Sequence, residues 1–131
     1  MSDSDLTVLV VDDQADIRFA LTEGLEMLHD CCVYTAQNGA EALETLQTSA
    51  IDVMLVDILL PDVNGLEFLK RVCGDETLNR PRKIVVMSGL VDASTGTLVR
   101  ELGGDGVLPK PFSLDQLDAA VTTTRSPGIA A

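Results

Sequence analysis

The chain is poor in aromatic and basic residues. It has no tryptophan, one tyrosine and three phenylalanines among 131 residues, although hydrophobic residues make up 46% of it. A core of this composition has to be built mainly from Leu, Val, Ile and Ala. Lys and Arg number 9 against 21 Asp and Glu, giving a formal net charge of −12. Because nucleic-acid backbones are bound by clustered Lys and Arg, this balance argues against nucleic-acid binding by the domain itself.

Cysteine, histidine and long apolar runs are also scarce. The cysteines are Cys31, Cys32 and Cys73, and the single histidine is His29. They do not form a zinc-ligand pattern, so reduced thiols are expected. No apolar run approaches the roughly 20 residues that a membrane helix needs, and the N-terminus has no basic region of the kind that opens a secretory signal. These features predict a cytoplasmic protein that does not bind a membrane.

Short apolar runs alternate with apolar residues at helical spacing, which predicts strands separated by helices. The predicted strands are 6–11, 33–36, 53–56, 84–87 and 107–108, and the apolar stripes of the predicted helices cover 17–28, 40–46, 66–73, 95–102 and 113–124. Ala20 belongs to the first stripe, and Ser113 is the predicted N-cap of the last helix. The polar segment 74–82, which includes Pro81, is expected to be a surface loop.

This alternation predicts an α/β fold with a doubly wound, five-stranded parallel sheet, helices on both faces and right-handed crossovers. We expect one domain over residues 1–125 and a disordered tail over 126–131. Ligands of such folds bind beyond the carboxyl ends of the strands, where the strand order reverses.

Polar side chains follow four of the predicted strands. Asp12 and Asp13 follow the first strand, Asp57 the third, Ser88 the fourth and Lys110 the fifth. Singly, each has a structural explanation: an Asp before a helix is usually an N-cap, a Ser here is usually a turn residue, and a lone Lys is usually solvated. Together they bring three carboxylates, a hydroxyl and an ammonium to one rim of the sheet.

This combination of groups suits phosphoryl chemistry. Three close carboxylates repel one another, and a divalent cation removes that conflict. Mg²⁺ prefers oxygen ligands and binds through one or two carboxylates together with phosphate oxygens. Asp57 can then be the nucleophile toward phosphorus, while Lys110 supplies positive charge and Ser88 a hydrogen bond. No general base is needed, because an ionised carboxylate has no proton to lose.

The segments around these residues resemble the receiver domains of two-component response regulators, including the chemotaxis regulators. The resemblance covers residues 6–124, and its motifs are Val-Leu-Val-Val-Asp12-Asp13, Val-Asp57-Ile-Leu-Leu-Pro61-Asp-Val-Asn-Gly65, Val-Met-Ser88-Gly89 and Leu-Pro-Lys110-Pro111-Phe112. It implies a flavodoxin-like sheet of order 2-1-3-4-5. In that order the fifth strand is an edge strand, where Pro109 is tolerated.

The same resemblance implies how the site works. It implies phosphorylation of Asp57, Mg²⁺ held by Asp13 and Asp57 with help from Asp12, and a cis bond before Pro111. The implied phosphodonor is a sensor histidine kinase or a histidine phosphotransfer protein, and the implied reader is a downstream protein or an output domain. Such a domain catalyses only its own phosphorylation and dephosphorylation.

The resemblance further implies a contact or weak dimer face on the fourth helix, fifth strand and fifth helix, with the protein otherwise a monomer. Arg100, Glu101 and Asp105 are its candidate charged residues. The sequence leaves open whether the chain is a single-domain regulator or a receiver cut from a longer protein.

Two features depart from the family pattern. Val107 replaces the Tyr or Phe usual three residues before the lysine, so a smaller rearrangement carried by the Ser88–Gly89–Leu90 loop and the fourth helix is expected. Leu59 and Leu90 occupy positions that influence the access of water to the acyl phosphate. Because both are apolar, we expect slow self-hydrolysis.

Other functions fit the sequence less well. A degenerate receiver acting only as a docking surface is disfavoured, because every site residue is present. A haloacid-dehalogenase-type phosphatase has a second Asp two residues after its nucleophile, where this chain has Leu59. A flavodoxin relative needs a Ser/Thr/Gly-rich phosphate loop where this chain has Asp12 and Asp13. His29, at a predicted helix C-terminus, is expected to interact with the helix dipole rather than donate phosphate.

Overall fold

Five strands alternate with five helices along the part of the chain that the computed structural model describes, residues 6–89 and 93–122. The strands are β1 (Leu6–Val11), β2 (Cys31–Ala36), β3 (Val53–Asp57), β4 (Lys83–Ser88) and β5 (Gly106–Pro109); the helices are α1 (Ala15–Leu28), α2 (Gly39–Thr48), α3 (Gly65–Gly74), α4 (Ala93–Glu101) and α5 (Leu114–Thr122). The predicted tail, 126–131, and the predicted end of the last helix, 123–124, lie outside the described residues. No helix in the described ranges has the length and apolar character needed to span a membrane.

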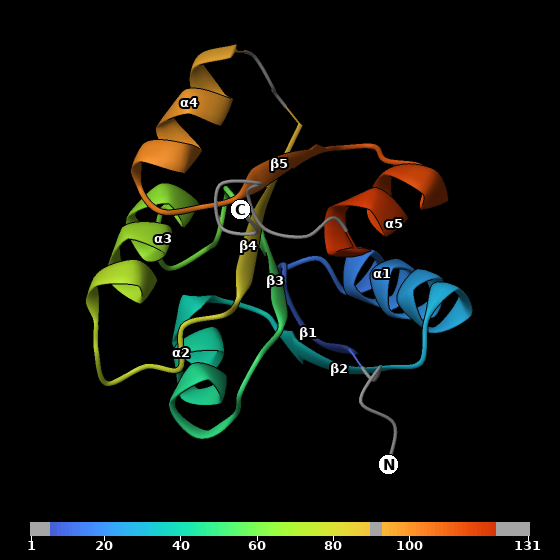
Figure 1. Cartoon of the computed structure of the whole chain (residues 1–131), viewed down its shortest axis with the longest axis horizontal. Coiled ribbons are helices and arrows are strands. Elements are labelled where there is room, and N and C mark those ends of the chain that lie inside the picture. The colour runs from blue at the N-terminus through green and yellow to red at the C-terminus, as the bar shows by residue number, and fades with distance from the viewer. Residues whose placement is uncertain (1–5, 90–92, 123–131) are drawn as a thin grey trace, which may run out of the picture.

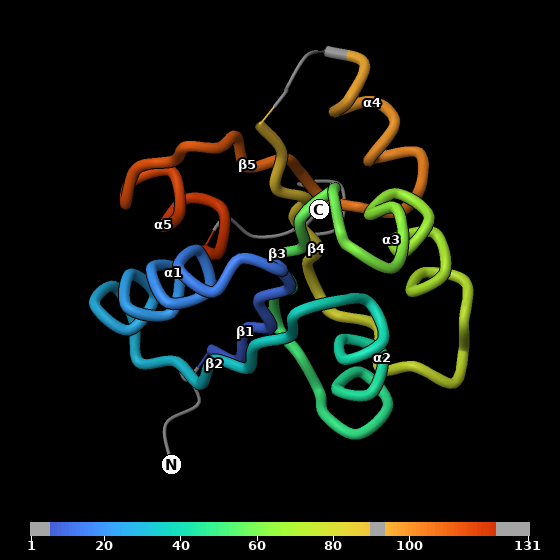
Figure 2. Tube along the Cα trace, turned by 180° about the vertical axis from the view of Figure 1, so that it is seen from behind, coloured from blue at the N-terminus to red at the C-terminus, as the bar shows by residue number. Residues whose placement is uncertain are grey.

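All strand pairs are parallel, and the strand order is β2-β1-β3-β4-β5. Helices α1 and α5 cover one face of the sheet, and α2, α3 and α4 cover the other (Figures 1 and 2). The doubly wound fold and its order are therefore confirmed. Within residues 6–89 and 93–122, β5 pairs with β4 alone, so Pro109 lies on an edge strand as expected. The peptide bond between Lys110 and Pro111 is cis.

The central strands are buried on both faces, and alternate residues serve two different cores. Leu9, Met54 and Val86 pack in the core beneath α2, α3 and α4. Their neighbours Val8, Leu55 and Val85 pack in the core beneath α1 and α5. Since side chains alternate across a strand, each run of consecutive apolar residues fills both cores. This explains why the strands read as continuous apolar runs rather than alternating ones.

Three local features differ from the prediction. Strand β2 starts at Cys31 rather than residue 33, and all six of its residues align with β1. Because β2 is an edge strand with exposed positions such as Cys32, it lacks the apolar run that marks a central strand. Ala20 is exposed and lies outside the buried face of α1. The 74–82 loop is anchored inward, with Leu78 and Pro81 buried.

The C-terminal helix α5 is fixed at its start and along its length. Ser113 is its N-cap: its Oγ accepts a hydrogen bond from the Gln116 backbone N–H at 3.1 Å, and Gln116 Oε1 accepts one from the Ser113 N–H at 2.8 Å. This reciprocal pair is a capping box. Further along, Asp118 Oδ1 lies 2.8 Å from His29 Nε2 at the C-terminus of α1. His29 thus has a specific partner on α5 that the sequence did not predict.

Gly65 allows α3 to start directly against the end of β3. A Cβ atom at Gly65 would lie 2.5 Å from Ile58 Cα and 2.6 Å from the Asp57 carbonyl oxygen, both of them backbone atoms. The Gly65 N–H also donates to the Ile58 carbonyl at 2.8 Å. Glycine is required here by close approach, and this approach fixes the loop that follows Asp57.

We expect Gly65→Ala to lower the free energy of unfolding by about 1–3 kcal/mol, the usual cost of forcing an extra carbon into a filled space. Gly74, at the other end of the same helix, is a matched control because a Cβ there meets nothing within 4 Å. Gly74→Ala should be neutral or stabilising by up to about 1 kcal/mol. Urea unfolding followed by circular dichroism measures both changes, and equal effects of the two substitutions would contradict the packing argument.

Candidate functional site

The carboxyl ends of β1, β3 and β4 lie side by side at one edge of the sheet, and the sequence-predicted residues meet there. Asp12 directly follows β1, Asp57 is the last residue of β3, and Ser88 is the last residue of β4. Lys110 directly follows β5. A cleft of about 600 Å³ opens at this edge, and its lining is Asp13, Gln14, Asp57, Ile58, Leu59, Ser88, Gly89 and Lys110.

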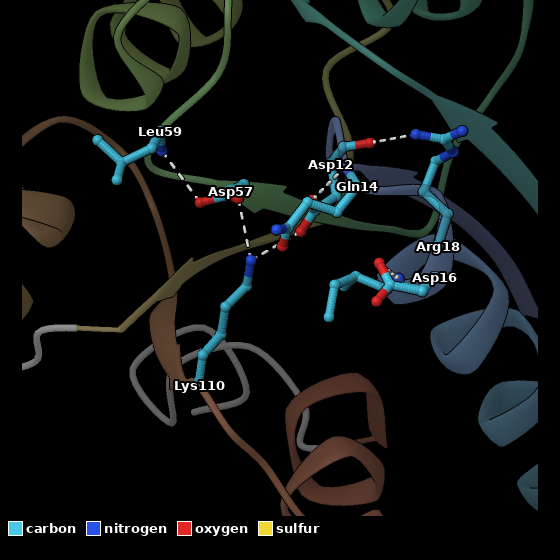
Figure 3. A network of polar contacts seen from close by, with 8 residues as sticks. Asp12, Gln14, Asp16, Arg18, Asp57, Leu59 and Lys110 are labelled. Atoms are coloured by element: carbon cyan, nitrogen blue, oxygen red, sulfur yellow. Dashed lines mark hydrogen bonds and ion pairs between the residues drawn. The ribbon is translucent and has the colours of Figure 1, made fainter.

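Lys110 bridges the two buried carboxylates (Figure 3). Its Nζ lies 2.8 Å from Asp12 Oδ2 and 2.9 Å from Asp57 Oδ2. Asp12 is fully buried and Asp57 is 7% exposed. Burial by itself would lower the pKa of the Lys110 ammonium, but its hydrogen bonds and attraction to the two carboxylates outweigh burial and raise that pKa above its ordinary value. Lys110 is therefore a fixed positive charge at neutral pH.

Asp12 combines a structural contact with a place in the charged cluster. Its Oδ1 accepts a hydrogen bond from the Gln14 backbone N–H at 3.0 Å, just before α1. This contact is an Asx turn and not a helix cap, because the N-cap of α1 is Gln14, which has no side-chain capping hydrogen bond. Burial raises the pKa of the Asp12 carboxyl, and the negative charge of Asp57 adds to the rise, against the hydrogen bonds from Lys110 and Gln14. An additional positive charge nearby would therefore stabilise the ionised form of Asp12.

Asp13 completes a group of three carboxylates. Side-chain oxygens of Asp12, Asp13 and Asp57 all lie within 4.8 Å of one another. Asp13 is exposed to the cleft, whereas the other two are buried. Three carboxylates and one ammonium leave two uncompensated negative charges at the rim. Oxygen donors, this spacing and an open side fit a hard divalent cation.

Asp57 is held from both sides. Its Oδ1 accepts a hydrogen bond from the Leu59 backbone N–H at 3.0 Å, while Lys110 holds Oδ2. The Ile58 N–H donates to the Met87 carbonyl at 3.0 Å, so the pairing of β3 with β4 continues past the last residue of β3. The carboxylate is thus oriented by backbone and side-chain contacts together.

Two contacts at the site were not predicted from the sequence. Arg18, on the first turns of α1, donates from Nη1 to the Asp12 carbonyl oxygen at 2.8 Å and so connects α1 to the segment that carries Asp12 (Figure 3). A basic residue six positions after Asp12 in an otherwise acidic segment is a usable signal for this contact. The Leu59 amide gives no such signal, because every residue other than proline carries one.

The positions that depart from the family pattern also have defined surroundings. Val107 is partly buried against the core beneath α2, α3 and α4. Leu59 is 73% exposed and lines the cleft, whereas Leu90 lies outside the described residues.

One candidate on the implied contact face has a structural contact of its own. Arg100 and Glu101 are exposed, but Asp105 Oδ2 accepts a hydrogen bond from the Ile84 backbone N–H at 2.8 Å. Asp105 therefore fastens the segment before β5 to the start of β4.

Comparison with known proteins agrees with this geometry. A model of the response regulator receiver domain family matches residues 8–122. The DNA-binding transcriptional regulator NtrC of Escherichia coli K12 is 34% identical over 114 residues, which are 87% of this chain and 24% of NtrC. The Mycobacterium tuberculosis regulator TrcR is 36% identical over 119 residues, 88% of this chain and 44% of TrcR. The chain thus spans less than half the length of these curated relatives.

A solved structure of similar fold has a modified aspartate. This response regulator from Burkholderia pseudomallei, described with a phosphorylated aspartic acid, a calcium ion and citrate, superposes with a TM-score of 0.79 at 28% identity, covering 96% of this chain and 72% of that one. With the strand order, the residues at the strand ends and the family match over most of the sequence, the conclusion is that this chain belongs to the response regulator receiver domain family of two-component systems.

Proposed function

We propose that the chain accepts a phosphoryl group on Asp57 and transmits this event as a change in its protein-binding surface. The observation that carries the proposal is the arrangement of charges at the rim. The Asp57 carboxylate lies at the end of a buried strand, 2.9 Å from the Lys110 ammonium, and opens on the cleft beside Asp13. The phosphorylated aspartic acid described for the Burkholderia regulator supports the same chemistry.

The proposed reaction is a transfer from a phosphohistidine. A carboxylate oxygen of Asp57 attacks phosphorus, the P–N bond to the donor imidazole breaks, and its electron pair stays on the imidazole nitrogen. The product is an acyl phosphate on Asp57. The chain needs to supply mainly position and charge neutralisation, because phosphoryl transfer involves little other covalent chemistry for the protein.

Lys110 and Ser88 are proposed to stabilise the transferred group. Lys110 contacts Asp57 Oδ2 directly, so its ammonium is within reach of a phosphoryl group attached to that carboxyl. Ser88 is buried at the end of β4 and lines the same cleft. Its hydroxyl is proposed to donate a hydrogen bond to a phosphoryl oxygen.

Asp12, Asp13 and Asp57 are proposed to hold Mg²⁺. When bound, the ion would neutralise charge on the phosphoryl oxygens. Asp13 offers an exposed carboxylate to it, and Asp57 a carboxylate already oriented by the Leu59 amide. Asp12 lies deeper, and both of its carboxylate oxygens already accept hydrogen bonds. It would therefore assist Asp13 and Asp57 in holding the ion through its negative charge.

The proposed donor is a sensor histidine kinase or a histidine phosphotransfer protein, and the proposed reader is a downstream protein or an output domain. In a signalling role of this kind, the chain would catalyse only its own phosphorylation and dephosphorylation.

The face of α4, β5 and α5 is the proposed contact or weak dimer surface. Val107 has no ring to reorient, so the proposed switch is a shift of the segment after Ser88 together with α4, biased by the state of Asp57.

Incubation with acetyl phosphate and Mg²⁺ should add the mass of one phosphoryl group to the intact protein. Asp57→Asn should abolish the gain because the amide is not a nucleophile toward phosphorus, and a chelator should abolish it by removing the cation. Intact-mass spectrometry reads all three samples. A folded protein that binds Mg²⁺ but gains no mass would instead be a docking domain without phosphoryl chemistry.

Asp13→Asn should weaken Mg²⁺ binding by about tenfold or more, since even outer-shell changes at metal sites cost 10–100-fold. Stability in chelator should change little, because Asp13 is exposed. Asp16→Asn is the matched control, because this substitution also removes one negative charge. Asp16 is exposed on the first turn of α1 and does not line the cleft. Isothermal titration calorimetry gives both affinities. Equal affinities for the two variants would remove Asp13 from the proposed ligand set.

Leu59→Asn should shorten the lifetime of the acyl phosphate. The exposed apolar side chain borders the cleft, and a polar group there can hold an attacking water near phosphorus. Met27→Asn is the matched control, because Met27 is 76% exposed on α1, close to the 73% of Leu59, and does not line the cleft. Loss of phosphoryl mass with time after removal of acetyl phosphate gives the half-life. A longer half-life for Leu59→Asn would contradict the proposed slow hydrolysis.

A further inference from the structure

The loop that follows Asp57 is tied to the start of α2 by the carboxylate of Asp62. Asp62 Oδ1 accepts a hydrogen bond from the Gly39 backbone N–H at 2.9 Å, and Oδ2 accepts one from the Ala40 N–H at 3.0 Å. These amides open α2, where unpaired N–H groups and the helix dipole favour a negative charge. The bond to Gly39 contributes most to holding the pKa of Asp62 below its usual range, so the side chain is ionised at neutral pH.

This contact adds to a cap that α2 already has. Asn38, the N-cap residue, accepts a hydrogen bond from the Glu41 N–H at 2.9 Å. The local sequence therefore starts the helix by itself, whereas Asp62 comes from a segment 22–23 residues away. The two residues satisfy different donors, because Asn38 accepts from Glu41 while Asp62 accepts from Gly39 and Ala40. The contacts of Asp62 cap the helix and also hold two distant segments together.

The loop tip and the helix start are also packed closely. A Cβ atom at Gly39 would lie 2.7 Å from Val63 Cγ1, next to Asp62. At the base of the same loop, Leu59 pairs with Asn64 in an isolated antiparallel bridge, and the Gly65 N–H bonds to the Ile58 carbonyl. The loop is thus closed at its base, beside Asp57, and fastened at its tip, on α2.

The start of α2 also follows closely on the pairing of β1 with β2. The Asp12 backbone N–H donates to the carbonyl of Ala36 at 3.1 Å, which continues that pairing beyond Val11. Ala36 is the last residue of β2, and α2 begins at Gly39. The side chain of Asp62 therefore links the loop after Asp57 to a helix start that lies close to the fixed end of β2.

We propose that Asp62 is a positioning residue: it sets the Leu59 amide against the Asp57 carboxylate and couples the state of Asp57 to the first turn of α2. The coupling to phosphorylation rests on the proposed function. Converting the carboxylate to an acyl phosphate moves the negative charge from the carboxyl oxygens to the phosphoryl oxygens, so the acceptor presented to the Leu59 N–H changes in position and charge. The base of the loop then readjusts, and Asp62 passes this change to α2.

The test uses the full chain with Asp62→Ala, Asp62→Asn and the control Asp75→Ala. Asp75 is a suitable control because its carboxylate also accepts two hydrogen bonds, from the N–H and hydroxyl of Thr77, but lies at the far end of α3. Amide hydrogen exchange by NMR on the unmodified protein reports the contacts of Gly39, Ala40 and Leu59. Acetyl phosphate labelling followed by intact mass reports the rate at Asp57.

In Asp62→Ala, the amides of Gly39 and Ala40 should exchange roughly tenfold faster or more, the effect of losing hydrogen bonds to a charged acceptor. The Leu59 amide, which Asp62 does not touch, should also exchange faster, and the phosphorylation rate should fall about three- to tenfold because a reacting group is misplaced. Asp62→Asn keeps an acceptor for one amide and should give smaller changes in the same direction. Asp75→Ala should leave all of these values unchanged.

Faster exchange confined to Gly39 and Ala40, with Leu59 unaffected, would overturn the proposal and reduce Asp62 to a second helix cap. Unchanged exchange at all three amides would overturn it too. If Asp62→Ala does not fold, the same three exchange rates, at Gly39, Ala40 and Leu59, are compared in Asp62→Asn. The exchange measurements need no phosphoryl transfer, so a chain that fails to accept phosphate would disprove the proposed function while the positioning role of Asp62 is still decided.

Discussion

The site depends on the ion pairs that one lysine makes with two buried carboxylates. Asp12 and Asp57 lie at the ends of neighbouring strands, and both carboxylates can be buried because Lys110 neutralises part of their charge. The Lys110 Nζ lies within 2.9 Å of one oxygen of each carboxylate. Removing one partner of a buried pair leaves an uncompensated charge, which typically costs about 3–5 kcal/mol. The strand order is compatible with this pairing, because it places β1 beside β3 and puts Lys110 just after the edge strand β5.

This charge balance is incomplete, because the rim carries more negative than positive charge. A single ammonium against three carboxylates leaves a region that favours further positive charge. Two hydrogen bonds also fix the geometry: the Leu59 backbone N–H holds the Asp57 carboxylate, and the Arg18 side chain holds the Asp12 carbonyl. A preorganised site of this kind avoids the cost of reorganising charged groups at the moment of reaction.

The sequence predicts the sheet well because the central strands are continuous apolar runs between helical stripes. It also predicts the five residues at the rim, since the carboxyl ends of parallel strands meet at one edge. It failed at the start of β2, where an edge strand has exposed residues such as Cys32, and at Leu78, a buried residue in a segment that is otherwise polar. The contacts of Leu59 and Asp62 could not be predicted because they depend on where backbone amides lie after folding, and the residue types alone do not specify this.

The absence of an aromatic residue at Val107 directs attention to the loop after Asp57, whose Ile58, Leu60 and Val63 pack against the same core as Val107. A branched aliphatic side chain packed into the core beneath α2, α3 and α4 has few alternative rotamers, so it offers little as a two-state element. The loop after Asp57 is different, because it is held at a small number of defined points: the Asp57 carboxylate, the Ile58–Gly65 bond and the Asp62 carboxylate. A change in charge at Asp57 acts directly on the first of these points. Since coupling between sites requires an element whose equilibrium both sites bias, the loop between β3 and α3 meets that requirement better than Val107 does.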